Sequence, residues 1–407
     1  IASLHLVQAA LRDRSPGEIR RFVKTLNGAD KEMYDYLAEE VVGELSLELQ
    51  RFLMDTAILQ VVTPDLAEVV SGHDAVDVAR LIAAAERVTL LSRLSGAPRT
   101  HQRYHPLVRE FLEARFRSLD GDEAVNALHR RTAAATTDWR IAAHHYREAG
   151  DTEAMLASVS RAIPEIMGNG QYALAEAFIE PVPPDERPTG FGLITSRVEM
   201  QQGDYQAAMA ASQAVLDSAT NAIERDYALL NLITLNINYG NVEATLNLAR
   251  RLQAETEDSH LQMIAEVSVA IVEAAGGGDL ERVYRKLRAL AATQKGKHQH
   301  QYGVSMHNLA TISWAQGRPD DALRELRDAI EALGATSASI ELASALVLQL
   351  TVLAATANWT AFSSKASEYE LSGPTQRDPD AVIDFADMMD AYVQPGDYNQ
   401  LVAGLEL

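Results

Sequence analysis

A turn-and-helix pattern recurs at nearly constant intervals through the second half of this 407-residue chain. Turn glycines stand 37, 38 and 39 residues apart, at Gly203, Gly240, Gly278 and Gly317. The series continues at Asn358 and Gly396. Repeats of this length are typical of stacked helix pairs, and glycine suits the turn within a pair because a tight turn often needs a positive φ. The pattern therefore predicts an α-solenoid.

The spacing after each glycine supports the same fold. We expect the residues six and nine places later to face inward from the second helix of each pair. These residues are Met209, Leu246, Tyr284 and Leu323, and Ser212, Ala249, Leu287 and Leu326. The predicted fold class is mostly α, with a TPR-like array that forms a right-handed superhelix of helix pairs.

The first part of the chain combines helices with one hairpin. Ser46 is a plausible N-cap for a helix in "SLELQRFLMDTAIL", and Gly72 is expected to end a short helix in "TPDLAEVVSG". "DAVDVARLIAAAER" predicts another helix, and "VTLLSRLSGAPRTHQRYH" alternates around a Ser-Gly-Ala-Pro turn as a β-hairpin does. Pro106 then suits the first position of the next helix. This order predicts a winged-helix-like unit.

We accordingly predict four segments. Residues 1–30 form a helical lead-in, 31–118 the winged-helix-like arm, 119–170 a helical linker or atypical first repeat, and 171–407 the TPR-like array. "PVPPDERP", at 181–188, is expected to be a non-helical joint. The array is expected to be truncated at its C-terminus, because the last unit stops at Leu407 without a polar capping helix.

Charge and composition disfavour several classes of function. After Gly150 the chain has 17 basic and 35 acidic side chains, so −18 of the total −21 lies there. A broadly acidic surface disfavours direct binding of nucleic acid or of an anionic membrane. The absence of cysteine fits a reducing cytoplasm, and neither a signal peptide nor a spanning apolar run is recognisable in the sequence. We expect a cytoplasmic protein.

Catalytic and metal motifs are also missing from the sequence. It contains no phosphate-binding loop, dinucleotide-binding glycine motif, metalloprotease motif or nucleophile elbow, which favours a chain that is not itself an enzyme. His298, His300 and His307 are interpreted as a polar helix start, because residues two apart do not share a helix face. The adjacent His144 and His145 are interpreted as surface or packing residues. No metal site is predicted.

The hairpin region is rich in arginine. Seven arginines stand against two glutamates between positions 87 and 117: Arg87, Arg93, Arg99, Arg103, Arg109, Arg115 and Arg117, with Glu110 and Glu113. A basic wing can bind DNA, can be a solvated surface, or can contact a neighbouring domain or nucleotide. DNA readout is the weakest of the three, because "DAVDVARLIAAAER" is rich in alanine and begins with acidic residues.

Two stretches together resemble a known family. "YLAEEVVGELSLELQRFLMDTAIL" followed by "QRYHPLVREFLEARF" is similar to the region just after the ATPase core of STAND-class signalling ATPases. The resemblance is strongest to MalT-like bacterial transcriptional regulators of the large LuxR type. It implies that residues 1–30 end an ATPase-associated helical region, and that the arm links a nucleotide-binding domain to a TPR-like sensor. The specific part of the resemblance covers about 90 residues.

The resemblance also implies a role for His105. Tyr104-His105-Pro106 stands where related STAND proteins have a Met-His-Asp motif, whose histidine reaches the β-phosphate of bound ADP. Carried over, His105 would contact the nucleotide of an ATPase domain, with ADP or ATP as the cofactor of the longer protein. Pro106 replaces the aspartate, which puts coupling through a carboxylate in doubt. A packing or hairpin-closing histidine is the alternative.

Two functions are expected from these observations. In the first, the chain is the sensing and regulatory portion of a STAND-type ATP-dependent transcriptional regulator. An inducer or inhibitory protein would bind the concave face of the array, the arm would relay binding to the missing ATPase domain, and activation could bring oligomerisation. In the second, the chain is a stand-alone TPR-like adaptor whose acidic array binds a basic peptide or protein.

Overall fold

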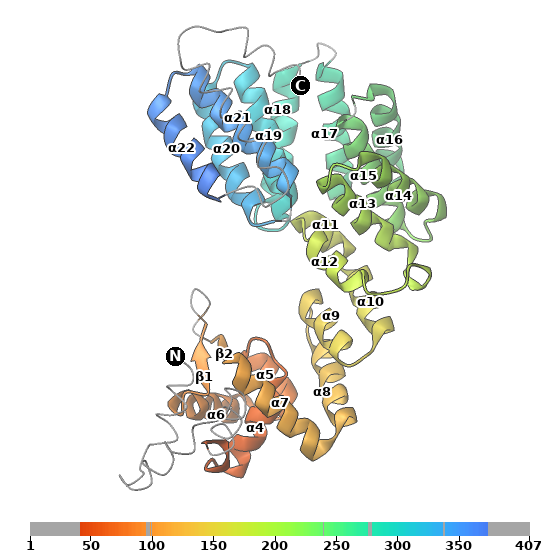
Figure 1. Cartoon of the computed structure of the whole chain (residues 1–407). Helices are drawn as coiled ribbons and strands as arrows, with labels where there is room; N and C mark the ends of the chain where they lie inside the picture. Colours follow the sequence, from red (N-terminus) through yellow and green to blue (C-terminus); the bar gives the residue numbers. More distant parts are fainter. Residues whose placement is uncertain are drawn as a thin grey trace. The chain divides into compact units, whose positions relative to one another are not determined.

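The computed structural model describes residues 41–94, 98, 100–238, 240–275, 279–336 and 338–372. The chain divides into two compact units, residues 1–159 and 160–407. This division falls inside the predicted segment 119–170, and the four predicted segment boundaries remain predictions. Figure 1 shows the elements of each unit in sequence colours.

The first unit is mainly helical. Its elements are α4 (Leu47–Ala57), α5 (Pro64–Ser71), α6 (Ala75–Arg87), β1 (Leu91–Arg93), β2 (Gln102–Tyr104), α7 (Pro106–Asp120), α8 (Asp122–Ala135), α9 (Trp139–Glu148) and α10 (Thr152–Arg161), whose last residues cross the division. The helix expected in "YDYLAEEVVGEL" lies largely outside the described residues.

Local signals begin and end these helices as predicted. The Ser46 hydroxyl accepts from the Leu49 N–H and caps α4, while Gly72 adopts φ 71° at the end of α5. Asp74 caps α6 by accepting from two backbone N–H groups. One apolar core holds α4 to α8 together, with Phe52, Phe116 and their neighbours almost completely buried. This core covers α4 to α7 of the predicted arm and extends into α8, which lies in the predicted segment 119–170.

The hairpin carries the wing. Strands β1 and β2 are antiparallel, with Leu91 opposite Tyr104 and Arg93 opposite Gln102. Gln102 also forms an isolated antiparallel bridge with Val62, which lies between α4 and α5. The order helix, bridge strand, two helices and hairpin is that of a winged helix, and it confirms the predicted fold. The Val62 bridge was not predicted.

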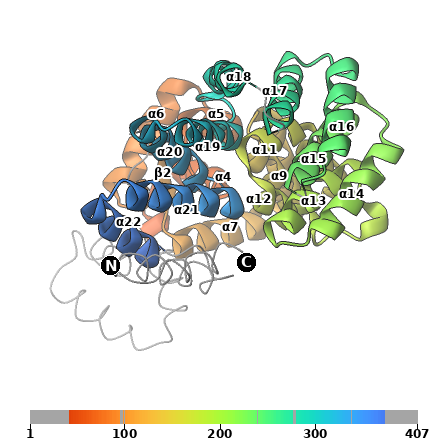
Figure 2. The same cartoon turned by 90° about the horizontal axis from the view of Figure 1, so that it is seen from above.

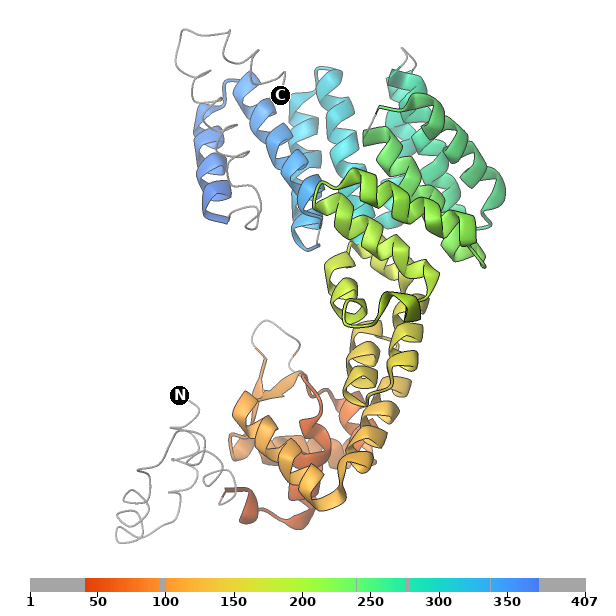
Figure 3. The same cartoon turned by 45° about the vertical axis from the view of Figure 1, so that its right-hand side comes forward.

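The second unit is a row of helix pairs. It contains α11 (Ile163–Asn169), α12 (Tyr172–Ile179), α13 (Gly192–Gln201), α14 (Tyr205–Ser218), α15 (Ala222–Asn238), α16 (Val242–Glu255), α17 (Ser259–Ala275), α18 (Leu280–Gln294), α19 (Gln299–Ala315), α20 (Pro319–Gly334), α21 (Ser339–Ala355) and α22 (Trp359–Ser372). We call α13 to α22 the array; in Figure 3 it is the green-to-blue part. The predicted TPR-like solenoid is confirmed.

The turns of the array follow the predicted glycines. Gly203, Gly240 and Gly317 have φ of 83°, 68° and 72° at the turns within three pairs. In the turn before α22, Ala357 rather than the predicted Asn358 has the positive φ, at 56°. Gly278 and Gly396 lie outside the described residues.

The prediction of inward-facing residues was half right. Nine places after each glycine the side chain is buried, as expected. Six places after, only Tyr284 is buried, whereas Met209, Leu246 and Leu323 are half-buried. Residues five places after the glycine are all buried instead: Ala208, Thr245, Val283 and Ala322. Positions five and nine are four residues apart and share one helix face, which explains the shift by one.

The proline-rich segment 181–188 was expected to be non-helical. It contains one short 3-10 turn, Pro184–Glu186, and a second turn, Thr189–Phe191, leads into α13. Fixed φ at proline is compatible with such a turn but not with a longer α-helix. Within the described residues, no helix is long and apolar enough to cross a membrane.

Candidate ligand pocket and arm histidine

His105 stands at the entrance of α7. Its backbone is extended, with φ −64° and ψ 139°, and its Nδ1 accepts a hydrogen bond from the Leu107 N–H at 3.4 Å. The imidazole is exposed. Partial desolvation, aided by Arg103, lowers the pKa of His105 and thus favours the neutral ring. In that state, Nδ1 as the acceptor leaves the proton on Nε2.

The two neighbours of His105 fix its position. Tyr104 is buried, and its hydroxyl lies 2.5 Å from the Thr56 hydroxyl of α4. Pro106 occupies the first turn of α7, where no backbone N–H is needed. A core tyrosine on one side and a helix start on the other thus hold an exposed imidazole between them. The structure shows this cap geometry, while nucleotide contact by His105 stays a prediction.

Several arginines of the arm pair with local carboxylates. Arg93 pairs with Glu86, Arg109 with Glu113 and Arg117 with Asp122. On α6, which corresponds to "DAVDVARLIAAAER" and would be the recognition helix in DNA readout, Arg80 pairs with Glu48 and Asp77. Side chains committed to these pairs do not form a row of free donors for DNA bases. Arg99 lies outside the described residues.

A pocket of about 280 Å³ opens among the first helices of the repeats. Helices α13, α15, α17, α19 and α21 all line it, together with parts of α11 and α18. Figure 2 shows α14 and α16 on the outer side of α13 and α15. The pocket thus lies on the inner side of the array, and we call it the concave pocket.

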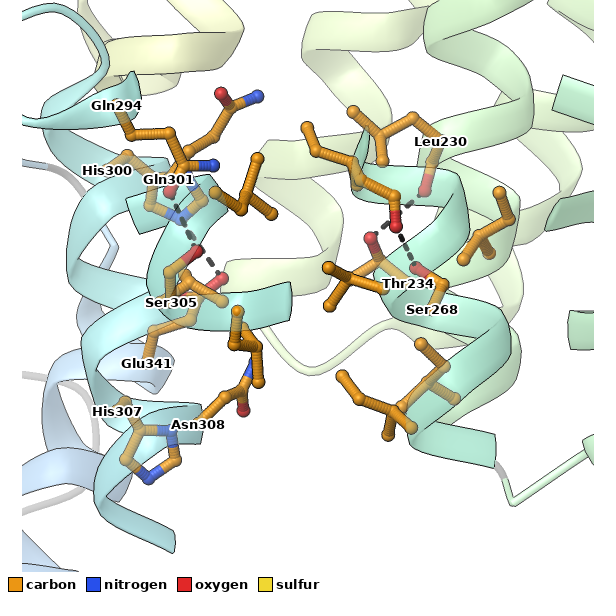
Figure 4. Close-up of a pocket in the computed structure, with 18 of the residues that line it drawn as sticks. Leu230, Thr234, Ser268, Gln294, His300, Gln301, Ser305, His307, Asn308 and Glu341 are labelled. Atoms are coloured by element: carbon orange, nitrogen blue, oxygen red, sulfur yellow. Dashed lines mark hydrogen bonds and ion pairs between the residues drawn. The ribbon is translucent and has the colours of Figure 1, made fainter. Parts of the chain in front are cut away.

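The walls of the concave pocket differ in chemistry. Figure 4 shows α19 with Gln301, Ser305 and Asn308 facing the wall that carries Thr234 and Ser268. The rest of the lining is largely aliphatic and comes from α15, α17 and α18: Leu230, Ile233, Ile237, Ile264, Val267, Ile271, Leu287 and Leu290. A few polar groups among aliphatic side chains are typical of small-molecule sites.

Four residues at one end of the pocket join distant parts of the chain. We call Tyr172, Gln201, His300 and Glu341 the closure cluster. His300 lies between the Tyr172 hydroxyl, 3.2 Å from Nδ1, and the Glu341 carboxylate, 3.4 Å from Nε2. Gln201 donates to Glu341 at 2.7 Å and accepts from the Ile340 N–H at 3.0 Å. The start of the second unit and α13 are thereby tied to α19 and α21.

These hydrogen bonds stabilise the ionised form of Glu341. Burial would raise the pKa of Glu341, but the hydrogen bonds and charge of His300, together with the bond from Gln201, lower it to about 2. Asn169 adds a further tie, because its side-chain oxygen accepts from the Gln299 N–H at 3.0 Å. In most solenoids a repeat contacts only its neighbours. Here a polar network joins elements about 130 residues apart.

Arg197 of α13 also lines the concave pocket. The residue is only 5% exposed. Nε donates to the Asn231 side-chain oxygen at 2.7 Å, and the guanidinium carbon lies 5.8 Å from the centre of the Tyr172 ring. The Asn231 amide in turn donates to the Leu193 carbonyl at 3.2 Å, which directs its oxygen toward Arg197.

The histidine predictions have mixed outcomes. The interpretation of the 298–307 group as a polar helix start is wrong for His300, which is buried in the closure cluster. His145 is buried against His129, with their Nδ1 atoms 2.9 Å apart, so packing is its role. Among the described residues, no group of three histidine, aspartate or glutamate side chains is placed to hold a metal. Arg197, Gln201 and Glu341 were not singled out from the sequence.

Residues 38–124 match the family model described as the MalT winged helix domain. The arm is a MalT-type winged helix. In the chain this winged helix is followed by a TPR-like array.

Two further similarities cover different shares of the chain. The serine/threonine-protein kinase PknK of Mycobacterium tuberculosis, and that of Mycobacterium bovis, are 30% identical over 126 residues, 31% of this chain and 11% of each relative. The chain therefore matches only about a tenth of these relatives' length. A STAND protein with a tetratricopeptide repeat sensor, PH0952 from Pyrococcus horikoshii, aligns over 97% of this chain and 70% of its own, with a TM-score of 0.44 and 12% identity.

Proposed function

We propose that this chain is the signal-sensing and regulatory portion of a STAND-type, nucleotide-switched transcriptional regulator. The supporting observation is the combination of a MalT-type winged helix with an array that has a concave pocket. In this proposal an inducer or inhibitory partner binds the concave face. The arm passes the change to a nucleotide-binding domain outside these 407 residues, and that domain would use ADP and ATP.

The closure cluster provides the two-state element that such a sensor needs. A ligand changes a conformational equilibrium only if it binds one state better than the other. The pocket is lined by the same α13, α19 and α21 that the cluster joins. A ligand that fits the pocket only while the cluster is intact would therefore stabilise the closed array.

His105 is the proposed contact between the arm and the nucleotide. It is exposed at a helix start, where backbone N–H groups and the helix dipole favour an anion. With Nδ1 engaged by Leu107, Nε2–H would donate to a phosphate oxygen. The proposal thus assigns the imidazole a donor role that requires no positive charge on the ring.

The test is the rate of ADP release from the longer protein that contains this chain. His105→Ala removes both the ring and the cap, whereas His105→Asn keeps a capping oxygen and removes only the ring. We expect both variants to release ADP at least about tenfold faster, as expected for loss of a hydrogen bond to a charged group. His101→Ala, a histidine of the same arm, is the matched control and should match the wild type. Unchanged release in both His105 variants would rule out the contact.

The adaptor function remains a second proposal, supported by the charge of −18 after Gly150. A basic peptide would associate with the array at a rate that falls steeply with salt. Stopped-flow measurement of a Lys- and Arg-rich peptide at low and high salt separates the two proposals. Binding that leaves ADP release unchanged in the longer protein would favour the adaptor.

A further inference from the structure

Among the described residues, the buried charged side chains Asp55 and Asp226 each have a partner of opposite charge, whereas Arg197 does not. Asp55 of α4 is buried beside Arg51 at 2.9 Å, and Asp226 of α15 beside Arg225 at 2.8 Å. Arg197 is buried to the same degree, yet no carboxylate of the described residues lies within ion-pair distance of its guanidinium. An uncompensated buried charge is strongly destabilising. The counter-charge is therefore expected from a group other than the carboxylates of the described residues.

The surroundings of Arg197 hold it ready for such a group. Asn231 is fixed by the Leu193 carbonyl and engages only Nε of the guanidinium. The nearby Tyr172 ring offers its aromatic surface rather than an anion. The two terminal nitrogens of Arg197 form no hydrogen bond with the described residues. These nitrogens are the donor pair that matches a carboxylate or phosphate.

The nearest acidic residue of the pocket does not supply the counter-charge. Glu341 is already bound by His300 and Gln201, which leaves its carboxylate satisfied. Among the described residues, no ion pair joins Glu341 to Arg197. The pocket therefore contains a carboxylate that His300 and Gln201 already engage, and a guanidinium without an ion pair among the described residues.

The geometry points to a small organic anion with an apolar body as the ligand of the concave pocket: we propose that its carboxylate or phosphate binds Arg197 and its body lies against the aliphatic wall of α15 and α17. This inference rests on the proposed sensor function and names the chemical class of its ligand. The volume of about 280 Å³ suits a compact molecule rather than a folded partner. The side-chain amide of Asn308 on α19 can donate an additional hydrogen bond to the anion. The Thr234 and Ser268 hydroxyls donate to backbone carbonyls of their own helices.

Binding at Arg197 would also reach the closure cluster. Arg197 lies against the Tyr172 ring, and the Tyr172 hydroxyl contacts His300 of α19. An anion that neutralises Arg197 removes the cost of its burial only while α13, α19 and α21 enclose the pocket. The same ligand would therefore favour the closed array over an open one.

The test compares an acid with its neutral isostere on the whole 407-residue chain. Hexanoate and hexyl phosphate carry the proposed acid groups on one apolar body, and hexanamide carries the same body without charge. Calorimetry should give the wild type at least about tenfold tighter binding of one of the two acids than of hexanamide, which corresponds to one charge-assisted hydrogen-bond pair.

Three variants locate the effect. Arg197→Met removes the charge at similar length and should abolish the preference for the acids, while circular dichroism and an unchanged or raised melting temperature show that the array still folds. Arg197→Lys keeps the positive charge but lacks the paired terminal nitrogens of the guanidinium, and should retain part of the preference for the acids. Arg251→Gln changes an exposed arginine of α16 that pairs with Glu255, and should bind as the wild type does.

Each outcome decides the inference. It is overturned if the wild type binds hexanoate, hexyl phosphate and hexanamide equally, if neither acid binds below about 10 mM, or if the preference survives in Arg197→Met. Acid binding through Arg197 without any change of ADP release in the longer protein would leave the anion site standing and would remove the sensor function. A neutral ligand that alters ADP release equally in wild type and Arg197→Met would support the sensor function and would remove the anion site.

Discussion

The arm and the array solve the problem of buried polar groups in different ways. In the arm, the buried Asp55 is matched by Arg51 one helical turn away, and Tyr104 reaches Thr56 within one apolar core. In the array, His300 meets Glu341 and Tyr172 from helices far apart in sequence, and Arg197 meets no carboxylate among the described residues. The buried polar groups of the arm are therefore paired within its own core. Those of the array either join distant helices or lie open to a ligand.

The largest expected effect tests the apolar core of the arm. Phe116 is buried against α4, with the Arg51 guanidinium 4.8 Å from its ring centre. Phe116→Ala should lower the free energy of unfolding of the arm by about 3–5 kcal/mol, because a cavity is left and aromatic surface is lost. Hydrogen exchange measured by mass spectrometry should show the loss in α4 to α8 and not in α13 to α22. Equal loss of protection in both regions would show that the arm and the array do not unfold independently.

Glu341→Gln tests the closure cluster. The change removes the carboxylate that His300 and Gln201 hold, and hydrogen bonds to charged groups contribute about 1.5–3 kcal/mol. We expect faster hydrogen exchange at the end of α13 and the start of α21, with the arm unchanged. Glu331→Gln, an exposed glutamate of α20, is the control. Unaltered exchange in α13 and α21 would mean that the cluster does not hold the array closed.

Acid should affect the array through the same residue. The folded pKa of Glu341 is lowered from 4.5 to about 2, chiefly by His300 against the opposing effect of burial. A carboxylate with a lowered folded pKa contributes its full stabilisation above the unfolded value, and that contribution is lost as the pH falls from about 4.5 toward 2. Chemical unfolding followed between pH 5 and 2.5 should show a steeper loss in the wild type than in Glu341→Gln. Parallel curves would contradict the assignment.

The smallest expected effects come from the turns of the array. Gly317→Ala places a side chain at φ 72°, which should destabilise the array by about 1 kcal/mol. Ala357→Gly relieves φ 56° at the equivalent turn and should stabilise by a similar or smaller amount, because the unfolded chain also gains freedom. Thermal unfolding measures both. Two shifts of the same sign would argue against equivalent turns.

The sequence was informative wherever structure depends on nearby residues. Ser46, Gly72 and Pro106 mark helix ends through their own backbone and side-chain chemistry, and the glycine spacing reflects one turn per repeat. One of the two predicted inward positions was off by one, because several residues on a helix face can satisfy the same apolar pattern. Local patterns therefore predicted both fold classes.

The site could not be predicted in the same way. Tyr172 and His300 are 128 residues apart, and Gln201 and Glu341 are 140 apart, so nothing in either local sequence indicates its partner. His300 looked like part of a polar helix start for that reason. Arg197 stands in "ITSRVEM", a stretch typical of many helices. Only the structure shows that this arginine is buried without an ion pair among the described residues. The site could not be recognised because its contacts join residues that lie far apart in the sequence.

The most direct test of the sensor proposal is the rate of ADP release from the longer protein carrying Glu341→Gln, compared with wild type and Glu331→Gln. The variant alters only the array, while the nucleotide would be held through the arm. We predict that loosening the closure cluster changes ADP release several-fold, and that Glu331→Gln leaves it as in the wild type. If hydrogen exchange confirms that α13 and α21 have loosened while ADP release stays the same, the array does not act on the nucleotide through the arm, and the relay is contradicted.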